Sequence, residues 1–118
     1  MQTLKSKIDT NSKEFQENKR AYMTLMSRYR DTMDQCMQGG GSLAVEKHKK
    51  RHKLLARERI DQLVDKNTPF LELSPMAAFD IYNNDFPSAG IITGIGIIQG
   101  REAIIVANDA TVKGGTYM

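Results

Sequence analysis

A chain of 118 residues with 40% hydrophobic and 26% charged residues has the size and composition of one ordinary globular domain, which excludes a disordered or fibrous segment. No apolar run approaches the roughly eighteen residues of a membrane-spanning helix, and the N-terminal residues resemble neither a signal peptide nor a transit peptide. The single cysteine, Cys36, excludes an internal disulfide. We therefore expect a reducing, cytoplasmic setting without membrane contact. The net charge of +3 is small but unevenly distributed.

The first predicted element is a helix from Ser12 to about Met37, with Ser12 as its N-cap and Glu14 in its first turn. Apolar side chains recur along it at helical spacings and form one stripe, which consists of Phe15, Tyr22, Met26, Tyr29, Met33 and Cys36. Glycines at 39–41 end the helix, because glycine takes up the left-handed conformation without steric cost. We expect the stripe to pack against the rest of the protein or against a second subunit.

A basic segment lies on a second predicted helix, for which Ser42 is the expected cap. Between Glu46 and Arg59 the basic residues outnumber the acidic ones, and they are Lys47, Lys49, Lys50, Arg51, Lys53, Arg57 and Arg59. This pattern favours an anionic partner, such as nucleic acid, a phosphorylated cofactor or an acidic protein surface, or else it is a solvated helix surface. The segment has no aromatic residue to stack on bases. Its histidines, His48 and His52, lie among cations that repel a metal ion, so we predict no metal site.

A further short helix is predicted over residues 57–65, and its buried side should be formed by Leu55, Ile60, Leu63 and Val64. Asn67-Thr68-Pro69 breaks this helix, and an extended run follows at 70–73. Residues 74–90 contain turn-forming residues throughout and predict a long irregular connection, of the kind that often binds a partner.

Two β-branched runs, 91–98 and 103–106, predict a hairpin joined by residues 99–102. Both runs are almost continuously apolar, so both faces of the sheet should be covered. Gly94 and Gly96 share one face and leave room for the close approach of another element. The upstream helices are too few to cover two faces, so we expect the second face to need material from elsewhere.

Two glycine motifs invite a nucleotide-binding interpretation, and both fail. Gly94-Ile95-Gly96 lacks the third glycine of a dinucleotide fingerprint and is followed by a strand instead of a helix. Lys113-Gly114-Gly115-Thr116 lacks the order of a phosphate-binding loop. Its glycines can still offer backbone N–H groups to an anion or a thioester oxygen, or they can simply form a turn. No nucleophile–base pair and no paired carboxylates are recognisable, so we predict no catalytic residue in this chain.

Five short sequence segments, here called words, occur in the same order as in a known family and together carry a resemblance that no single motif carries. They are GGG (39–41), KLLARERID (53–61), PFLEL (69–73), AGIITGIG (89–96) and VANDATVKGGTY (106–117). Together they resemble the N-terminal domain of carboxyltransferase β-subunits of biotin-dependent acyl-CoA carboxylases, and the last word is similar to the methylcrotonyl-CoA branch. The opening residues 6–10 are similar to bacterial members of that branch.

The resemblance implies an α/β, crotonase-like fold built of β-β-α units. Residues 1–38 would be a helical extension, and residues 39–118 the start of a carboxyltransferase domain that continues past Met118. It also implies transfer of a carboxyl group from carboxybiotin to an acyl-CoA, and the expected substrate is 3-methylcrotonyl-CoA in leucine degradation. The biotin would be carried by a partner biotin-carboxylase subunit, and the full-length subunit would be a homo-oligomer. The glycines of the oxyanion holes are expected beyond Met118, so the chain alone would be inactive.

The resemblance gives the basic segment a possible ligand, because coenzyme A carries a pyrophosphate and a 3′-phosphate. We expect Lys53, Arg57 and Arg59 near its nucleotide end, and Lys113, Gly114 and Gly115 nearer the thioester arm. The competing interpretation makes the arginines internal ion pairs with Asp61 or Asp65.

Two residues depart from the family pattern. Members usually have glycine where this chain has His52 and proline where it has Ala56. Ala56 should cost little at a helix start, but His52 is unfavourable if the site requires a positive φ. Two alternatives stay open: a carboxyltransferase for geranyl-, propionyl- or acetyl-CoA, and a stand-alone basic module that binds nucleic acid or an acidic partner.

Overall fold

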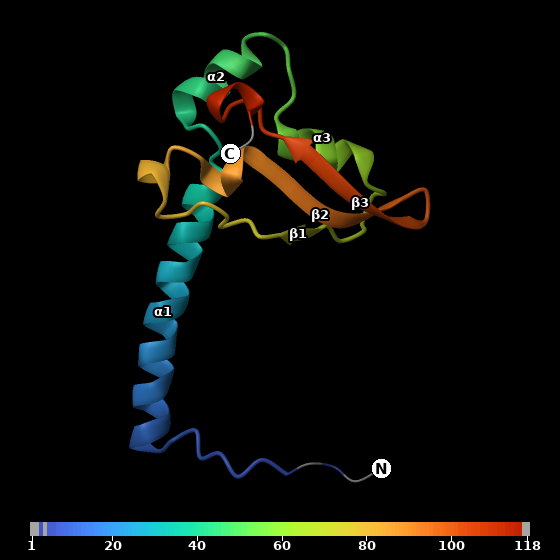
Figure 1. Ribbon diagram of the computed structural model, residues 1–118. Helices are drawn as coiled ribbons and strands as arrows, with labels where there is room; N and C mark the ends of the chain where they lie inside the picture. The colour runs from blue at the N-terminus through green and yellow to red at the C-terminus, as the bar shows by residue number, and fades with distance from the viewer. Residues whose placement is uncertain (1–2, 4, 117–118) are drawn as a thin grey trace. The chain divides into compact units, whose positions relative to one another are not determined.

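The computed structural model describes residues 3 and 5–116, and it confirms the α/β class in its simplest form: helices first, then a small sheet (Figure 1). The helices are α1 (Lys13–Met37), α2 (Ser42–Lys49) and α3 (Ala56–Leu63). The strands are β1 (Leu71–Leu73), β2 (Ile91–Ile98) and β3 (Arg101–Asn108). Single 3-10 turns lie at Tyr82–Asn84, Pro87–Gly90 and Lys113–Gly115. The chain divides into two compact units between Asp31 and Thr32, and the second unit holds α2, α3 and the sheet.

Helix α1 begins where the sequence predicts. The backbone N–H of Phe15 donates to Ser12 Oγ over 3.2 Å, so Ser12 caps the helix. In the first unit the apolar stripe lies at the surface, with Tyr22 and Tyr29 62% and 49% exposed. Gly39 then ends the helix with a φ of 59°.

The predicted cap of α2 is wrong. Ser42 is the first residue inside the helix and its side chain makes no capping hydrogen bond. The N-cap residue of α2 is Gly41, whose φ of 84° is accessible to glycine at no steric cost. The glycine triplet therefore ends one helix and also begins the next.

Helix α3 starts one residue earlier and ends two residues earlier than predicted. Ala56 and Ile60, four residues apart and so on one face, are 6% and 3% exposed. The expectation that Leu63 is buried is wrong, because it is 50% exposed. Val64 adopts an extended conformation directly after the helix and packs against the core, so it occupies the space over the sheet instead.

The sheet is antiparallel with the order β1-β2-β3, and the extended run at 70–73 supplies its third strand. Strands β2 and β3 are joined by a two-residue turn, which is shorter than predicted. Gln99 and Gly100 both have positive φ, 50° and 74°, as a tight hairpin turn requires. Arg101 and Glu102 therefore belong to β3, where they pair with the end of β2.

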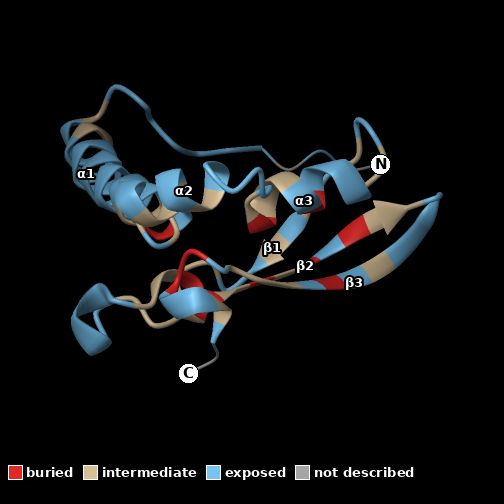
Figure 2. Ribbon diagram, turned by 90° about the horizontal axis from the view of Figure 1, so that it is seen from above, coloured by how far each residue is buried: buried red, intermediate tan, exposed pale blue. Residues whose placement is uncertain are grey.

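The core lies between α3 and one face of the sheet (Figure 2). Ile92 of β2 and Ile105 of β3 are 2% and 7% exposed and form a cluster with Ala56 and Ile60. The predicted role of the strand glycines is confirmed. A Cβ at Gly96 would lie 2.7 Å from Val64 Cγ1, and one at Gly94 would overlap the ring of Phe70.

The opposite face of the sheet is apolar and, within the described residues, uncovered. Leu71, Ile104 and Val106 on it are 60%, 76% and 57% exposed. The prediction that both faces are covered is therefore not met by the described part of this chain. Within the described residues the expectation that the upstream helices are too few is met, because α3 packs on one face of the sheet and the other face stays exposed.

Candidate functional site

Two lysines of the basic segment are held by acidic side chains of the same region. Lys49 Nζ lies 2.8 Å from Glu58 Oε1, and Lys50 Nζ lies 2.8 Å from Glu46 Oε1. Both pairs are partly or largely exposed, so each contributes little to stability. Their effect is to neutralise part of the charge that the sequence places here.

Glu58 receives donors from both sides, and its pKa is lowered. The Lys49 ammonium is the largest cause, followed by the backbone N–H of Leu55, which donates to Glu58 Oε2 over 2.8 Å. Both favour the ionised carboxylate and outweigh its partial desolvation. Glu58 thereby closes the first turn of α3 and ties it to the end of α2.

The structure shows one local interaction of His48 and the backbone conformation of His52. The ring Nε2 of His48 lies 3.0 Å from the carbonyl oxygen of Leu54. His52 has a φ of 56°, so the position where family members have glycine does require the left-handed region. Over the described ranges, 3 and 5–116, no three His, Cys, Asp or Glu side chains are grouped so that they could hold a metal ion.

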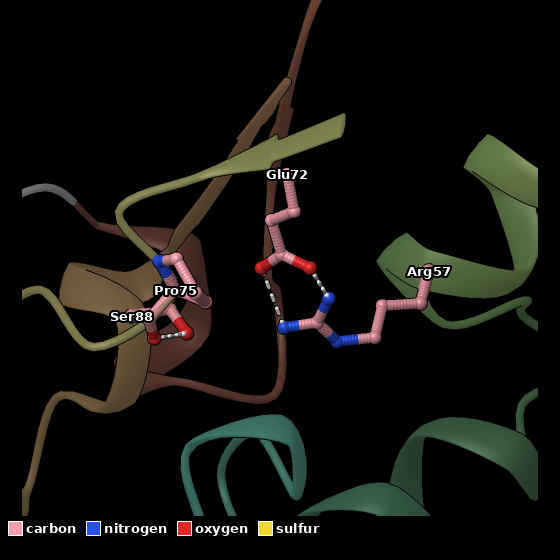
Figure 3. A network of polar contacts seen from close by, with 4 residues as sticks. All are labelled: Arg57, Glu72, Pro75 and Ser88. Carbon is pink, nitrogen blue, oxygen red and sulfur yellow. Dashed lines mark hydrogen bonds and ion pairs between the residues drawn. The ribbon is translucent and has the colours of Figure 1, made fainter. Parts of the chain in front are cut away.

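Arg57 forms a two-pronged ion pair with Glu72 of β1 (Figure 3). Its Nη2 donates to Oε1 over 2.9 Å while Nη1 donates to Oε2, and the two side chains are only 28% and 11% exposed. The competing interpretation named Asp61 or Asp65 as the partner, and the structure gives Glu72. The nearby thiol of Cys36 is buried, which raises its pKa, while the charge of Arg57 lowers it in part.

Lys53 and Arg59 are exposed, and neither makes an ion pair with any other residue that the structure describes. Arg59 lines a cleft of about 380 Å³ between α3 and β3, together with Leu63 and Val106. Their charge is thus available to an anion from solvent.

Three successive left-handed residues form the turn after β3. Lys113, Gly114 and Gly115 have φ of 43°, 75° and 87°. Lys113 Nζ lies 2.9 Å from Asp85 Oδ2 and 5.4 Å from the ring centre of Phe86. A Cβ at Gly114 would meet nothing within 4 Å, so the turn is open to a ligand on that side.

A polar cleft of about 350 Å³ joins this turn to the glycine triplet. Its lining comes from three chain segments, with Gly39, Gly40, Gly41, Asn84, Asp85, Pro87, Thr111, Val112 and Lys113. The first and last words of the resemblance therefore meet in space. Arg59 and Lys113 line different clefts, so the structure does not bring the two predicted groups of CoA-binding residues into one cleft.

The long connection 74–90 is fixed to the body of the second unit at its ends. Ser88, 5% exposed, donates from Oγ to the carbonyl oxygen of Pro75 over 2.8 Å (Figure 3). Ala89 N–H donates to the carbonyl oxygen of Ala77 over 3.1 Å. These bonds hold the connection so that Asp85 reaches Lys113.

Sequence reasoning missed two residues that line this cleft, Asp85 and Thr111, and also Asp109, which bonds to Thr111. Asp85 and Asp109 are unremarkable turn residues in the sequence, and Thr111 carries no motif of its own. Gly40 N–H donates to Thr111 Oγ1 over 2.9 Å, across 71 residues of chain. The only available signal was that the glycine triplet and the last word belong to one resemblance.

The match to a known protein family covers four of the five words. The family model described as carboxyl transferase domain matches residues 47–118, which is more than half of the chain. The chain belongs to the carboxyl transferase domain family. No helix among the residues the structure describes is long and apolar enough to cross a membrane.

The similar members of the carboxyl transferase family are much longer than this chain. A probable methylcrotonoyl-CoA carboxylase beta chain of Drosophila melanogaster is 49% identical over 115 residues, 97% of this chain and 20% of the relative. A biotin-dependent 3-methylcrotonyl-coenzyme A carboxylase beta1 subunit of Mycobacterium tuberculosis is 60% identical over 79 residues, 67% of this chain and 15% of the relative. The chain thus spans about a fifth or less of these curated relatives.

A solved carboxylase beta subunit has a similar fold. The beta subunit of P. aeruginosa geranyl-CoA carboxylase matches with a TM-score of 0.78 and 33% identity, over 97% of this chain and 21% of that subunit. Its fold covers the helices as well as the sheet of the present chain.

Proposed function

We propose that the chain is part of a carboxyltransferase component that moves a carboxyl group from carboxybiotin to 3-methylcrotonyl-CoA. The observation that carries this is the 49% identity to a methylcrotonoyl-CoA carboxylase beta chain across 97% of the chain. The mycobacterial relative, with 60% identity, supports the same substrate.

The proposal includes a crotonase-like fold, with residues 39–118 in the carboxyltransferase domain and residues 1–38 as a helical extension. It is supported by the family match at 47–118 and by the likeness to the geranyl-CoA carboxylase subunit. A biotin-carrying partner subunit and assembly of several copies are part of the proposal. A reducing compartment such as the cytoplasm suits the free, buried thiol of Cys36.

Biotin carried by the partner would supply the activated carboxyl group. The described residues of this chain would bind and orient the acyl-CoA. The open turn at Gly114 fits that role, because its backbone can be approached closely.

We place the acyl-CoA contacts at Lys113, Gly114 and Gly115, with Lys53 and Arg59 as cations for the phosphates. The ion pair of Arg57 with Glu72 favours a structural role for that arginine over direct contact with the nucleotide. Lys113 shares its charge with Asp85, so an anionic ligand must compete with this carboxylate.

This competition gives a test with two opposite outcomes. In calorimetric titration of the chain with 3-methylcrotonyl-CoA, Lys113→Ala should weaken binding about tenfold, since it removes a charge-assisted contact. Asp85→Asn should strengthen binding, because it frees the ammonium. No change in either variant would contradict the assignment of Lys113.

The same titration separates the substrates and the function classes. The likeness to a geranyl-CoA carboxylase subunit makes geranyl-CoA the second candidate, and propionyl- and acetyl-CoA complete the series. We expect tighter binding of 3-methylcrotonyl-CoA than of these three. Failure to bind any acyl-CoA, combined with salt-sensitive binding to nucleic acid, would replace the proposal with a basic binding module.

A further inference from the structure

A chain of polar contacts connects the glycine triplet to the turn that carries Lys113. Gly40 N–H donates to Thr111 Oγ1 over 2.9 Å, and Thr111 Oγ1 donates onward to Asp109 Oδ1 over 2.6 Å. The backbone N–H of Thr111 also donates to Asp109 Oδ1, over 2.9 Å. We call these three residues, Gly40, Thr111 and Asp109, the glycine–threonine junction.

The junction is closely packed. Thr111 and the following Val112 are 9% and 1% exposed. A Cβ at Gly40 would overlap the carbonyl group of Thr111, and one at Gly39 would lie 2.7 Å from Asp109 Oδ2. A side chain at position 40 would therefore displace the backbone of Thr111, and one at position 39 would have to move the Asp109 side chain and adopt a φ of 59°.

The junction is also anchored to the sheet. Asp109 N–H donates to the carbonyl oxygen of Gly90 over 2.9 Å, directly before β2 begins. At its other end it leads within two residues to the left-handed Lys113, a conformation that an L residue keeps only where its surroundings hold it. Val112 N–H donates to the carbonyl oxygen of Asp109 over 3.0 Å, so the junction holds the residue directly before Lys113.

We propose that Thr111 and Asp109 are positioning residues, which hold the Lys113-Gly114-Gly115 turn in the conformation that binds the acyl-CoA. This inference rests on the proposed function. Neither side chain needs to touch the ligand: each acts through the backbone that leads to the turn. The glycine triplet, 71 residues away in the sequence, then contributes to the acyl-CoA site indirectly, because Gly40 bonds to Thr111 and so helps to hold the turn.

The test compares variants that lose the side-chain hydrogen bonds of the junction with variants that keep them. Thr111→Val keeps the shape but loses the hydroxyl, and Thr111→Ser keeps the hydroxyl. Asp109→Asn keeps the Oδ1 acceptor, and Asp109→Ala removes it. In titrations of the chain with CoA, Thr111→Val and Asp109→Ala should weaken binding about tenfold, and Thr111→Ser and Asp109→Asn should bind within about twofold of the original chain.

A destabilised control separates positioning from general loss of stability. Ile60→Val loosens the core between α3 and the sheet but removes no hydrogen bond of the junction, so its melting temperature should fall while its affinity for CoA stays the same. If Ile60→Val weakens binding as much as Thr111→Val at equal loss of stability, positioning is refuted.

A measurement on the unsubstituted chain does not depend on the variants folding. Because coupling is reciprocal, bound CoA must stabilise the junction and slow hydrogen exchange of the Gly40 amide. Unchanged exchange at saturating CoA, or full binding by Thr111→Val, overturns the inference while the proposed function stands. A chain that does not bind CoA at all overturns both.

Discussion

His52 shows, at the scale of one residue, the cost of placing a side chain in a backbone conformation that favours glycine. Its φ of 56° puts a β-carbon where it crowds the following carbonyl, which costs about 1–2 kcal/mol. His52→Gly should therefore raise the free energy of unfolding by about 0.5–1 kcal/mol, after the greater flexibility of glycine in the unfolded chain is counted. Urea denaturation measures this.

The neighbouring Arg51, which does not have a positive φ, is the matched control. Arg51→Gly gains no relief of strain and should lower stability. Equal effects of the two glycine substitutions would show that the conformation at 52 carries no cost.

Glu58 makes stability depend on pH in a known direction. Its folded-state pKa lies below the ordinary value of 4.5, so the folded state favours the charged form. The stabilisation is present above that ordinary value and is lost as pH falls through it towards the lowered pKa. Melting temperatures between about pH 3 and 6 should thus fall less steeply in Glu58→Gln than in the original chain. Identical slopes would remove Glu58 as the cause.

At the scale of elements, Asp65 connects the end of α3 to the hairpin turn. Its two carboxylate oxygens accept from Gln99 N–H over 2.8 Å and Gly100 N–H over 2.7 Å, and its own N–H donates to the carbonyl oxygen of Ile97 over 2.8 Å. Asp65→Asn retains one acceptor and puts an NH₂ group opposite the other donor. We expect a loss of about 1–2 kcal/mol in thermal or urea unfolding.

The exposed Asp61 of α3 supplies the comparison for that substitution. It has no such contacts to the turn, so Asp61→Asn should change stability by less than about 0.5 kcal/mol. A loss as large as that of Asp65→Asn would mean that charge on α3, and not the link to the turn, is responsible.

Arg57 and Glu72 join α3 to β1 in the same way. Glu72→Gln leaves the guanidinium, 28% exposed, without its charge partner, so we expect a loss of about 1–3 kcal/mol. In a double-mutant cycle with Arg57→Gln, the double variant should lose less than the sum of the two single ones. Additive losses would argue that the pair contributes nothing by itself and would reopen the role of Arg57 in binding CoA phosphates.

At the scale of the whole molecule, the open face of the sheet should dominate behaviour in solution. Ile104 and Val106 lie on it with large exposed areas, and apolar surface of this kind promotes association. Ile104→Thr with Val106→Thr should lower the binding of a hydrophobic dye and shift sedimentation towards the monomer, with little loss of stability. Unchanged sedimentation would show that this face does not drive association.

The elements of the fold follow from local patterns. The helix of α1, its serine cap, the glycine stop and the hairpin were all predictable, because spacing and turn chemistry act between residues close in the chain. Predictions failed where two local solutions compete. Gly41 starts α2 instead of Ser42, and Val64 takes the buried place expected for Leu63.

The family of the chain and the basic character of residues 46–59 could be recognised from the sequence alone. The five words identify the family, and the charges can be counted without a structure. Only the tertiary structure decided which charges are engaged, with Arg57 held by Glu72 and Lys113 by Asp85. It also decided that Gly40 meets Thr111. The physical reason is that such contacts join residues far apart in the chain. Sequence periodicity reports only on residues that are close in the chain, whereas Gly40 and Thr111, 71 residues apart, meet only when the chain folds.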